Sequence, residues 1–326
     1  MWTLIVGVAR AEPATSDVPQ LADPFAPAGL TEGTPDVDPA HAWAVGVCRT
    51  ESECTEDTGK CSGTLVGPNL VLTARHCVDP GMYVSNTFCE IEFMGLQDPH
   101  ELFVTLEPDP YGSPRPATWR PVQAVYVPED PGICSSDVAI LVLETPVSPE
   151  EAAPAWLDVV TNLAEQPPSE VAVVARGRLN DADDGGFIRR IVEHIPVMCV
   201  SDVEGDCTMP DETYPSGVFV FPPPFAVIAP TLQTGDSGSG MIDQHSLAAG
   251  VPRVVAVNTI SAAPSEDSPA YASAGIRTSL HAEFLLAAAR DGAALGGLEP
   301  PPWRGPPPEG HDTGHTGDTG SPTTPT

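Results

Sequence analysis

Three short segments of the sequence carry side chains that could together perform nucleophilic catalysis. The first ends with His76, after two apolar runs separated by Pro-Asn. The second begins with Asp137 and continues into an unbroken apolar run, and the third is a glycine-dense loop around Ser237. Taken singly, these residues have ordinary explanations as a core or surface histidine, an acid that caps a strand and a polar loop residue.

Together the three residues predict acyl transfer through a covalent intermediate. A serine hydroxyl is a weak nucleophile at its ordinary pKa, so it needs a neighbouring base that accepts its proton. His76 could be this base, and Asp137 could orient the imidazole and stabilise its charged form while Ser237 attacks. They follow in the chain order His, Asp, Ser, at distances of 61 and 100 positions.

The elements that must position these residues are expected to be short β-strands. Between residues 42 and 292 short apolar runs recur, separated by Gly, Pro, Asn and Asp, which is typical of an all-β sandwich or barrel. A helix is expected over 279–289, where apolar residues recur at three- and four-residue spacing, and Asp291-Gly292 could stop it. The expected strands are 42–48, 63–66, 70–73, 123–127, 138–143, 171–175, 191–200, 218–221 and 254–260.

The three motifs resemble those of the chymotrypsin-like (trypsin-like) serine protease family, in a secreted bacterial-type member. The resemblance runs from about Ala42 to Gly292 and implies an all-β fold of two packed six-stranded antiparallel β-barrels with a C-terminal helix. His76 and Asp137 would come from the first barrel and Ser237 from the second. The implied function is a serine endopeptidase that acts on polypeptides and needs no cofactor or metal.

The resemblance also implies an oxyanion hole around the nucleophile. Gly235 and Ser237 would present backbone N–H groups to the developing oxyanion, and losing one such donor typically costs about 2.7–4 kcal/mol. Ser239 stands where the family usually has glycine, and Gly240 where it usually has proline. Both residues are small, so we expect the loop to be preserved.

Asp236 suggests activation by proteolysis, because in the family this acid pairs with the α-amino group that propeptide cleavage releases. Leu30, in Leu-Thr-Glu-Gly-Thr, is the nearest match to the family's mature N-terminus. Gly29 before it is not a trypsin-type cleavage site, so an activating protease of another kind would be needed. The alternative is that Glu12 begins the mature protein and another device supports the loop.

Specificity can be approached by position in the same way. Six residues before the nucleophile, the floor of the primary specificity pocket would be Thr231, which is not a carboxylate. Selectivity for Arg or Lys is therefore disfavoured, and a neutral pocket for small or apolar side chains is expected. Thr259 and Ser261 would form the wall and Gly275 the back, although Asp267 could also supply an acid.

Eight cysteines without CxxC spacing predict disulfides and an oxidising compartment. When the pair that the resemblance implies is set aside, the remaining six cysteines allow 15 connectivities. The expected pairs are Cys61–Cys77, which in the family pins the histidine loop; Cys199–Cys207, which would close a short loop; and, by elimination, Cys48–Cys54 and Cys89–Cys134.

The start of the chain predicts secretion. Residues 2–9 are apolar and are followed by a small-x-small cleavage pattern, so residues 1–11 are interpreted as a signal peptide; the alternative is a buried strand. Residues 12–41 are rich in Pro, Ala and Asp and are interpreted as a leader or propeptide. The protein is thus expected to be extracellular, either released or associated with the cell surface.

Composition restricts the partners. The chain has 326 residues, 14 Lys plus Arg and 45 Asp plus Glu, hence a net charge of -31, which argues against nucleic acid and anionic membranes as partners. No other apolar run reaches the length of a membrane span, and a monomer is expected.

The acidic run 180–186 is interpreted as a surface turn rather than a calcium site. Residues 293–326, rich in Pro, Gly and Thr with an Asp-Thr-Gly repeat, are expected to be a disordered tail.

Two rival functions remain open at this point. A non-catalytic binding module on the same fold would be displayed at the cell surface, as arises when a triad member is lost. A stalked surface domain would depend mainly on the Pro/Thr tail. All three triad members are present, which favours the enzyme.

Overall fold

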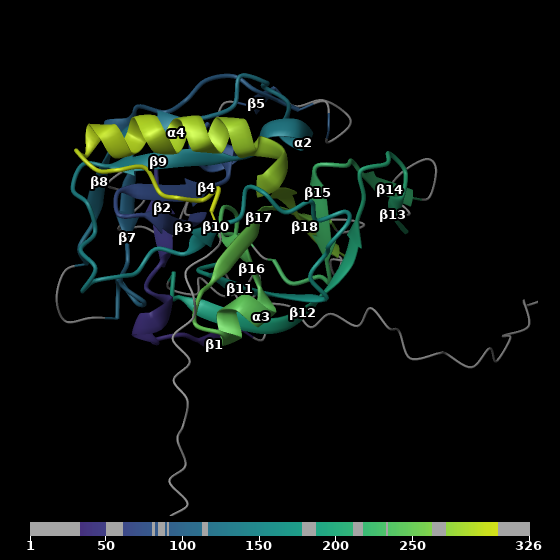
Figure 1. Cartoon of the computed structure of the whole chain (residues 1–326), viewed down its shortest axis with the longest axis horizontal. Helices are drawn as coiled ribbons and strands as arrows, with labels where there is room; N and C mark the ends of the chain where they lie inside the picture. Colours follow the sequence, from purple (N-terminus) through teal and green to yellow (C-terminus); the bar gives the residue numbers. More distant parts are fainter. Residues whose placement is uncertain are drawn as a thin grey trace, which may run out of the picture.

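Six short strands in the first half of the chain pair into a closed antiparallel barrel (Figure 1). The computed structural model describes residues 33–49, 61–79, 82–83, 89, 91–112, 117–177, 187–210, 218–232, 234–262 and 272–305. In pairing order the strands of this first barrel are β2 (Ala44–Cys48), β3 (Cys61–Gly67), β4 (Leu70–Thr73), β9 (Ala139–Leu143), β8 (Arg120–Tyr126) and β7 (Phe103–Thr105). β4 and β9 are buried along their whole length. This burial explains why their sequences are apolar almost throughout.

A second barrel follows in the chain. Its strands in pairing order are β12 (Arg190–Val200), β11 (Glu170–Ala175), β16 (Gly240–Asp243), β17 (Arg253–Ala262), β18 (Ala272–Arg277) and β15 (Phe225–Ile228), and β15 pairs with β12 to close the barrel. Two short strands are added to it: β1 (Thr34–Pro35) pairs with β12, and β10 (Trp156–Leu157) runs parallel to β17. The predicted fold class is confirmed.

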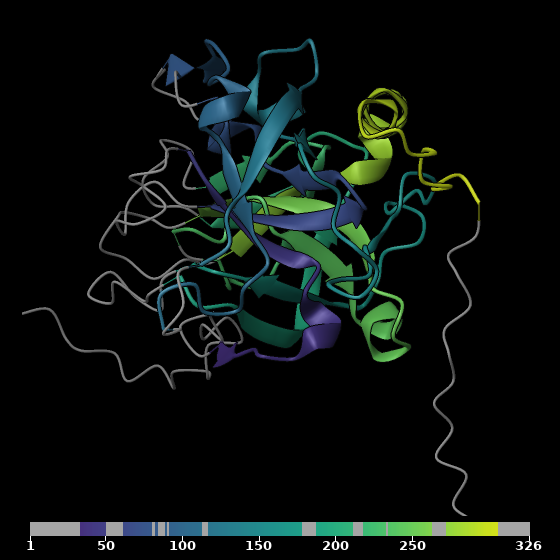
Figure 2. The same ribbon diagram turned by 90° about the vertical axis from the view of Figure 1, so that its left-hand side faces the viewer.

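Further elements lie before, between and after the barrel strands. They are the strand pairs β5 (Met82–Tyr83) with β6 (Glu92–Phe93) and β13 (Cys207–Pro210) with β14 (Val218–Phe221), the 3-10 turns η2 (Pro39–His41), η3 (Arg75–Cys77), η5 (Pro99–Glu101) and η6 (Thr278–His281), and the helices α2 (Ile133–Ser136), α3 (Gln244–Ala248) and α4 (Ala282–Leu295). The view in Figure 2 looks along α4, which lies at one side of the two barrels.

The C-terminal helix departs from the sequence prediction at its end. Asp291-Gly292 does not stop α4, which continues to Leu295. A Cβ atom on Gly292 would lie 2.8 Å from side-chain atoms of Leu70 and Val142 in the first barrel, and the Asn69 side chain donates a hydrogen bond to the Gly292 carbonyl at 2.8 Å. Gly292 therefore permits close approach of the helix to the barrel and is not a helix terminator.

The folded unit extends beyond 42–292 at both ends. On the N-terminal side, Asp36 is buried against the second barrel, where its Oδ2 lies 3.0 Å from Nε of Arg189. On the C-terminal side, Trp303 is 1% exposed and joins the apolar core centred on the first barrel. The expected boundaries before 42 and after 292 thus fall inside folded structure, because one buried ion pair and one buried tryptophan leave no periodic pattern in the sequence.

Three disulfides join described cysteines. Cys61–Cys77, Cys89–Cys134 and Cys199–Cys207 are paired as predicted. Cys48 is buried in β2, and its expected partner Cys54 lies outside the described residues. Further expectations that lie outside them concern the signal peptide 1–11, residues 12–32 with Leu30, the acidic run 180–186, Asp267 and the Asp-Thr-Gly repeat.

None of the helices in the described part of the chain combines the length and apolar character that a bilayer-spanning segment needs.

Candidate active site

The register of β4 and β9 brings the expected base and its acid to one edge of the first barrel. Thr73, at the end of β4, lies opposite Ala139, at the start of β9. His76 follows Thr73 in the turn η3, and Asp137 lies just before β9. Because antiparallel strands place the end of one beside the start of the other, the two residues meet although they are 61 positions apart in the chain.

Asp137 holds His76 with both carboxylate oxygens. Its Oδ2 lies 2.8 Å from His76 Nδ1, and its Oδ1 accepts the His76 backbone N–H at 2.8 Å. The Asp137 side chain is fully buried, whereas that of His76 is 21% exposed. With Nδ1–H donated to the carboxylate, the lone pair of Nε2 is the proton acceptor.

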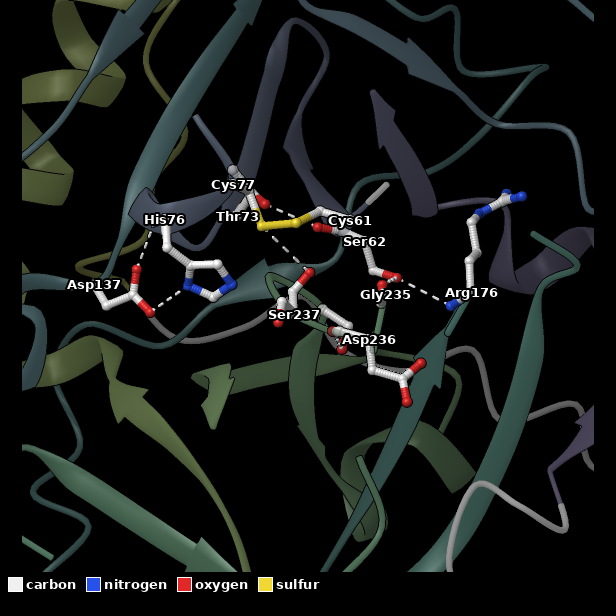
Figure 3. Close-up of a disulfide and its surroundings, with 11 residues drawn as sticks. Cys61, Ser62, Thr73, His76, Cys77, Asp137, Arg176, Gly235, Asp236 and Ser237 are labelled. Carbon is white, nitrogen blue, oxygen red and sulfur yellow. Dashed lines mark hydrogen bonds and ion pairs between the residues drawn. A yellow bond between two sulfur atoms is a disulfide. The ribbon is translucent and has the colours of Figure 1, made fainter. Parts of the chain in front are cut away.

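The electrostatics of this pair raise the pKa of the imidazole. Burial lowers the pKa of His76, but the charge of Asp137 and its hydrogen bond outweigh this effect, so the pKa is raised above its ordinary value of 6.5. Figure 3 shows the imidazole ring lying between Asp137 and Ser237. No hydrogen bond joins His76 to Ser237 in the described structure; in unliganded sites of this kind such bonds are often long and tighten when substrate binds.

Arg75 and Ser136, which the sequence analysis did not single out, position the segment that carries Asp137. Arg75 is buried and its Nη1 donates hydrogen bonds to the carbonyls of Pro128 and Asp130 at 3.0 and 2.8 Å. Ser136 donates from Oγ to the Asp130 carbonyl at 2.6 Å. The only sequence signal for Arg75 was its place next to His76.

The loop with the expected nucleophile lies against the first barrel. The Ser237 carbonyl accepts the backbone N–H of Ser62 at 2.8 Å. Gly235 and Gly238 have φ of +98° and +85°, which glycine adopts without the penalty other residues incur. A Cβ on Gly238 would also lie 2.1 Å from Thr73 Oγ1 and 2.3 Å from the Ser62 carbonyl oxygen. The glycine-dense sequence therefore follows from backbone geometry and from close packing between the barrels.

Asp236 is 1% exposed and points into the protein rather than toward His76. Its Oδ1 accepts the backbone N–H of Gly177 at 2.7 Å. A Cβ on Gly177 would lie 2.4 Å from that oxygen, so glycine is required for this contact. The expected partner, the α-amino group of Leu30, belongs to a residue outside the described ones.

The expected specificity residues lie on or beside two paired strands of the second barrel. Thr259 and Ser261 are in β17, and Gly275 is in the neighbouring β18. Thr231 is buried, its hydroxyl donates to a backbone carbonyl of its own segment, and its N–H donates to Oγ of Ser273 in β18 at 3.0 Å. The structure thus brings Thr231 beside the strand that carries Gly275, while the role of these residues in substrate binding stays a prediction.

One group of potential metal ligands occurs among the described residues, formed by Cys61, His76 and Cys77. Its two sulfur atoms are joined in a disulfide, so they offer no thiolate to a metal ion. The disulfide instead links β3 to the turn that carries His76, as Figure 3 shows.

Comparison with known proteins adds a family and a fold neighbour. A family model described as Trypsin matches residues 30–278. The crystal structure of the scabies mite inactivated protease paralogue S-I1 superposes with a TM-score of 0.55 at 18% sequence identity, covering 79% of this chain and 99% of that chain. Among curated proteins nothing matches. At this identity the structural likeness concerns the fold alone.

Proposed function

The chain belongs to the trypsin family, and from this premise we propose that it is a serine endopeptidase that cleaves polypeptides through an acyl-enzyme on Ser237. The observation that carries the proposal is the pair of 2.8 Å hydrogen bonds by which Asp137 holds His76. This contact sets the tautomer that a general base beside a serine nucleophile needs.

In the acylation half of the reaction, Ser237 Oγ bonds to the carbonyl carbon of the scissile peptide while Nε2 of His76 takes the hydroxyl proton. The carbonyl π bond opens to an oxyanion, which accepts hydrogen bonds from the N–H groups of Gly235 and Ser237. His76 then transfers its proton to the amide nitrogen, the C–N bond breaks and the amine leaves. The ester on Ser237 remains.

In the deacylation half, a water molecule takes the place of the amine. His76 accepts a proton from this water as its oxygen bonds to the acyl carbon, and then returns the proton to Ser237 Oγ as the ester bond breaks. Asp137 stabilises the imidazolium in both halves without taking its proton. The products are a carboxylic acid and an amine, and the net consumption is one water molecule.

The rival is a non-catalytic binding module on the same fold, displayed at the cell surface. The structural neighbour is itself described as an inactivated protease paralogue, so inactive members with this fold exist. In this chain the serine, histidine and aspartate are all retained, which favours catalysis.

The finer parts of the proposal concern maturation and substrate. The protein is a secreted monomer whose signal peptide is 1–11, and it is made as a zymogen that another protease cleaves to release Leu30. The primary pocket, with Thr231 at its floor and Thr259, Ser261 and Gly275 around it, accepts small or apolar side chains. N-terminal sequencing of the active form tests the first part, since Glu12 as the first residue of the active protein contradicts cleavage at Leu30.

Covalent labelling with a fluorophosphonate tests the central proposal. The secreted protein is treated before and after limited proteolysis near Gly29, beside Ser237→Ala and Ser246→Ala, a serine of α3 in the second barrel. We expect the wild type and Ser246→Ala to be labelled and Ser237→Ala to remain unlabelled. An increase in labelling after proteolysis identifies a zymogen. If the folded protein remains unlabelled in every form, the enzyme proposal is wrong and the binding module takes its place.

A further inference from the structure

Two peptide planes of the nucleophile loop link Gly235 and Ser237, whose N–H groups would form the oxyanion hole. The N–H of Ser237 belongs to the planar Asp236–Ser237 unit, so it points opposite to the Asp236 carbonyl. The adjoining Gly235–Asp236 unit follows a glycine with φ of +98°, the residue type with the most backbone freedom. A group that fixes the Asp236 carbonyl therefore also fixes the direction of the Ser237 N–H, and a group that fixes the Gly235 carbonyl holds the plane that joins Gly235, the other donor, to this unit.

Ser239 fixes the first of these planes. Its Oγ donates to the Asp236 carbonyl at 2.6 Å, and its backbone N–H reaches the same oxygen at 3.1 Å. The Asn258 side chain donates from Nδ2 to Ser239 Oγ at 2.8 Å. Because this amide hydrogen approaches a lone pair of the hydroxyl, the hydroxyl proton is directed toward Asp236. Ser239 and Asn258 are both fully buried, so water does not compete for these groups.

Ser62 fixes the second plane in the same way. Its Oγ donates to the Gly235 carbonyl at 2.9 Å and accepts the backbone N–H of Arg176 at 3.0 Å, contacts that Figure 3 draws. Ser62 belongs to β3 of the first barrel, whereas Gly235 and Arg176 belong to the second. This hydroxyl is also fully buried. The loop is thus held from both barrels.

We propose that Ser62 and Ser239 are positioning residues that preorganise the oxyanion hole, with Asn258 orienting the Ser239 hydroxyl. The inference rests on the proposed function and deepens it. The hydroxyls act on the peptide carbonyls on either side of Asp236 and do not touch the substrate. They supply side-chain support for the loop whichever residue begins the mature chain.

The test compares how the enzyme treats oxygen and sulfur at the reacting carbonyl. The probes are p-nitrophenyl acetate and its thionoester analogue, in which sulfur replaces the carbonyl oxygen. The measured quantity is the rate of the p-nitrophenolate burst, which reports acylation, after the signal of Ser237→Ala is subtracted. Sulfur is a weaker hydrogen-bond acceptor, so a well-formed hole accelerates the oxygen ester more than the thionoester.

The variants are Ser62→Ala and Ser239→Ala. Their matched control is Ser246→Ala, whose hydroxyl likewise donates to a backbone carbonyl, that of Asp243 at 2.7 Å, and accepts a backbone N–H, that of Arg253 at 2.9 Å. Complete loss of an oxyanion donor costs about 10²–10³ in kcat. A displaced donor should slow acylation by the oxygen ester about tenfold, slow the thionoester less, and so lower the oxygen-to-sulfur rate ratio.

The outcomes separate this inference from the proposed function. A lowered ratio in both variants with an unchanged ratio in Ser246→Ala supports the positioning role. Equal slowing of both esters, or no slowing, overturns it, because a merely structural hydroxyl does not alter the ratio. If either alanine variant fails to fold, Asn258→Ala, which keeps both hydroxyls, must lower the ratio in the same direction. The assay uses the protein after limited proteolysis near Gly29, and no burst from the wild-type protein in that form overturns the proposed function itself.

Discussion

Replacing Asp36 by alanine should strongly destabilise the fold, because this carboxylate compensates a charge that stays buried without it. Asp36 Oδ2 lies 3.0 Å from Nε of Arg189 and 3.1 Å from Nδ1 of His41. The side chains of Asp36 and Arg189 are 4% and 1% exposed. The pair joins the segment before the first barrel to the residue just before β12 of the second.

The magnitude follows from the burial of the partner. Removing one member of a buried ion pair costs about 3–5 kcal/mol, because the other charge remains buried and uncompensated. Arg189 retains the hydrogen bond from Nη2 to the Asp38 carbonyl at 2.7 Å. We therefore expect a loss near the lower end, about 3 kcal/mol, in the free energy of unfolding of Asp36→Ala. Asp36→Asn keeps an acceptor oxygen and should lose about half as much.

The effect has a defined pH window. Burial raises the pKa of Asp36, but the hydrogen bonds from His41 and from the Asp38 backbone, with the charge of Arg189, lower it overall below 3.8. Its contribution is present above that value and is lost as pH falls through the lowered pKa. The hydrogen bond to Asp36, partly offset by burial, raises the pKa of His41 above 6.5. That contribution is complete below 6.5 and is lost as pH rises through the raised pKa.

The difference between wild type and Asp36→Ala is therefore largest between about pH 4 and 6.5. Urea unfolding at pH 5.5 and pH 9 measures it. Asp291→Ala is the control, since its ion pair with Arg290 is exposed and exposed ion pairs contribute little to stability. Adding Arg189→Met to Asp36→Ala should recover part of the loss by removing the uncompensated charge. A loss below about 1 kcal/mol, unchanged by that second substitution, would refute the reasoning.

Three further results are expected. The acylation rate should rise with pH with a midpoint above 6.5, because His76 must be neutral to act as a base and Asp137 raises its pKa. A midpoint below 6.5 in burst kinetics contradicts this. Asp137→Asn should lower kcat by about 10⁴ through loss of the tautomer, measured with the same ester, and a loss under tenfold would exclude the orienting role. Gly292→Ala should lower the free energy of unfolding by about 1–3 kcal/mol through overpacking, whereas Gly95→Ala, whose Cβ meets nothing within 4 Å, serves as the control in urea unfolding.

The fold was predictable where local patterns report burial. The apolar runs that became β4 and β9 mark strands buried along their whole length. β18, with the sequence Ala-Ser-Ala-Gly-Ile-Arg, was missed because small residues carry little hydrophobic signal. Gly292 was misread because a glycine near a helix end has two causes, a break in the helix and close packing, and only the position of the barrel decides between them.

The site was predictable to the extent that it follows the strands. His76 and Asp137 each adjoin an apolar run, so their meeting at one barrel edge follows once those runs pair. The contact of Ser62 with Gly235 joins residues 173 positions apart in different barrels. A serine in an ordinary strand gives no sign of such a contact, since the hydrogen bond depends on how the barrels pack. Asp36 and Arg189 were missed for the same reason.

The ends of the folded unit cross over between the barrels. β1 precedes the first barrel in the chain yet pairs with β12 of the second, and α4 follows the second barrel yet packs on the first. During synthesis the first barrel is therefore complete in its strands long before the helix that covers it leaves the ribosome. The apolar surface that α4 covers on the first barrel is therefore exposed while the second barrel is translated, and exposed apolar surface of this kind promotes aggregation of nascent chains. The first barrel gains its helix only after the second barrel has been made.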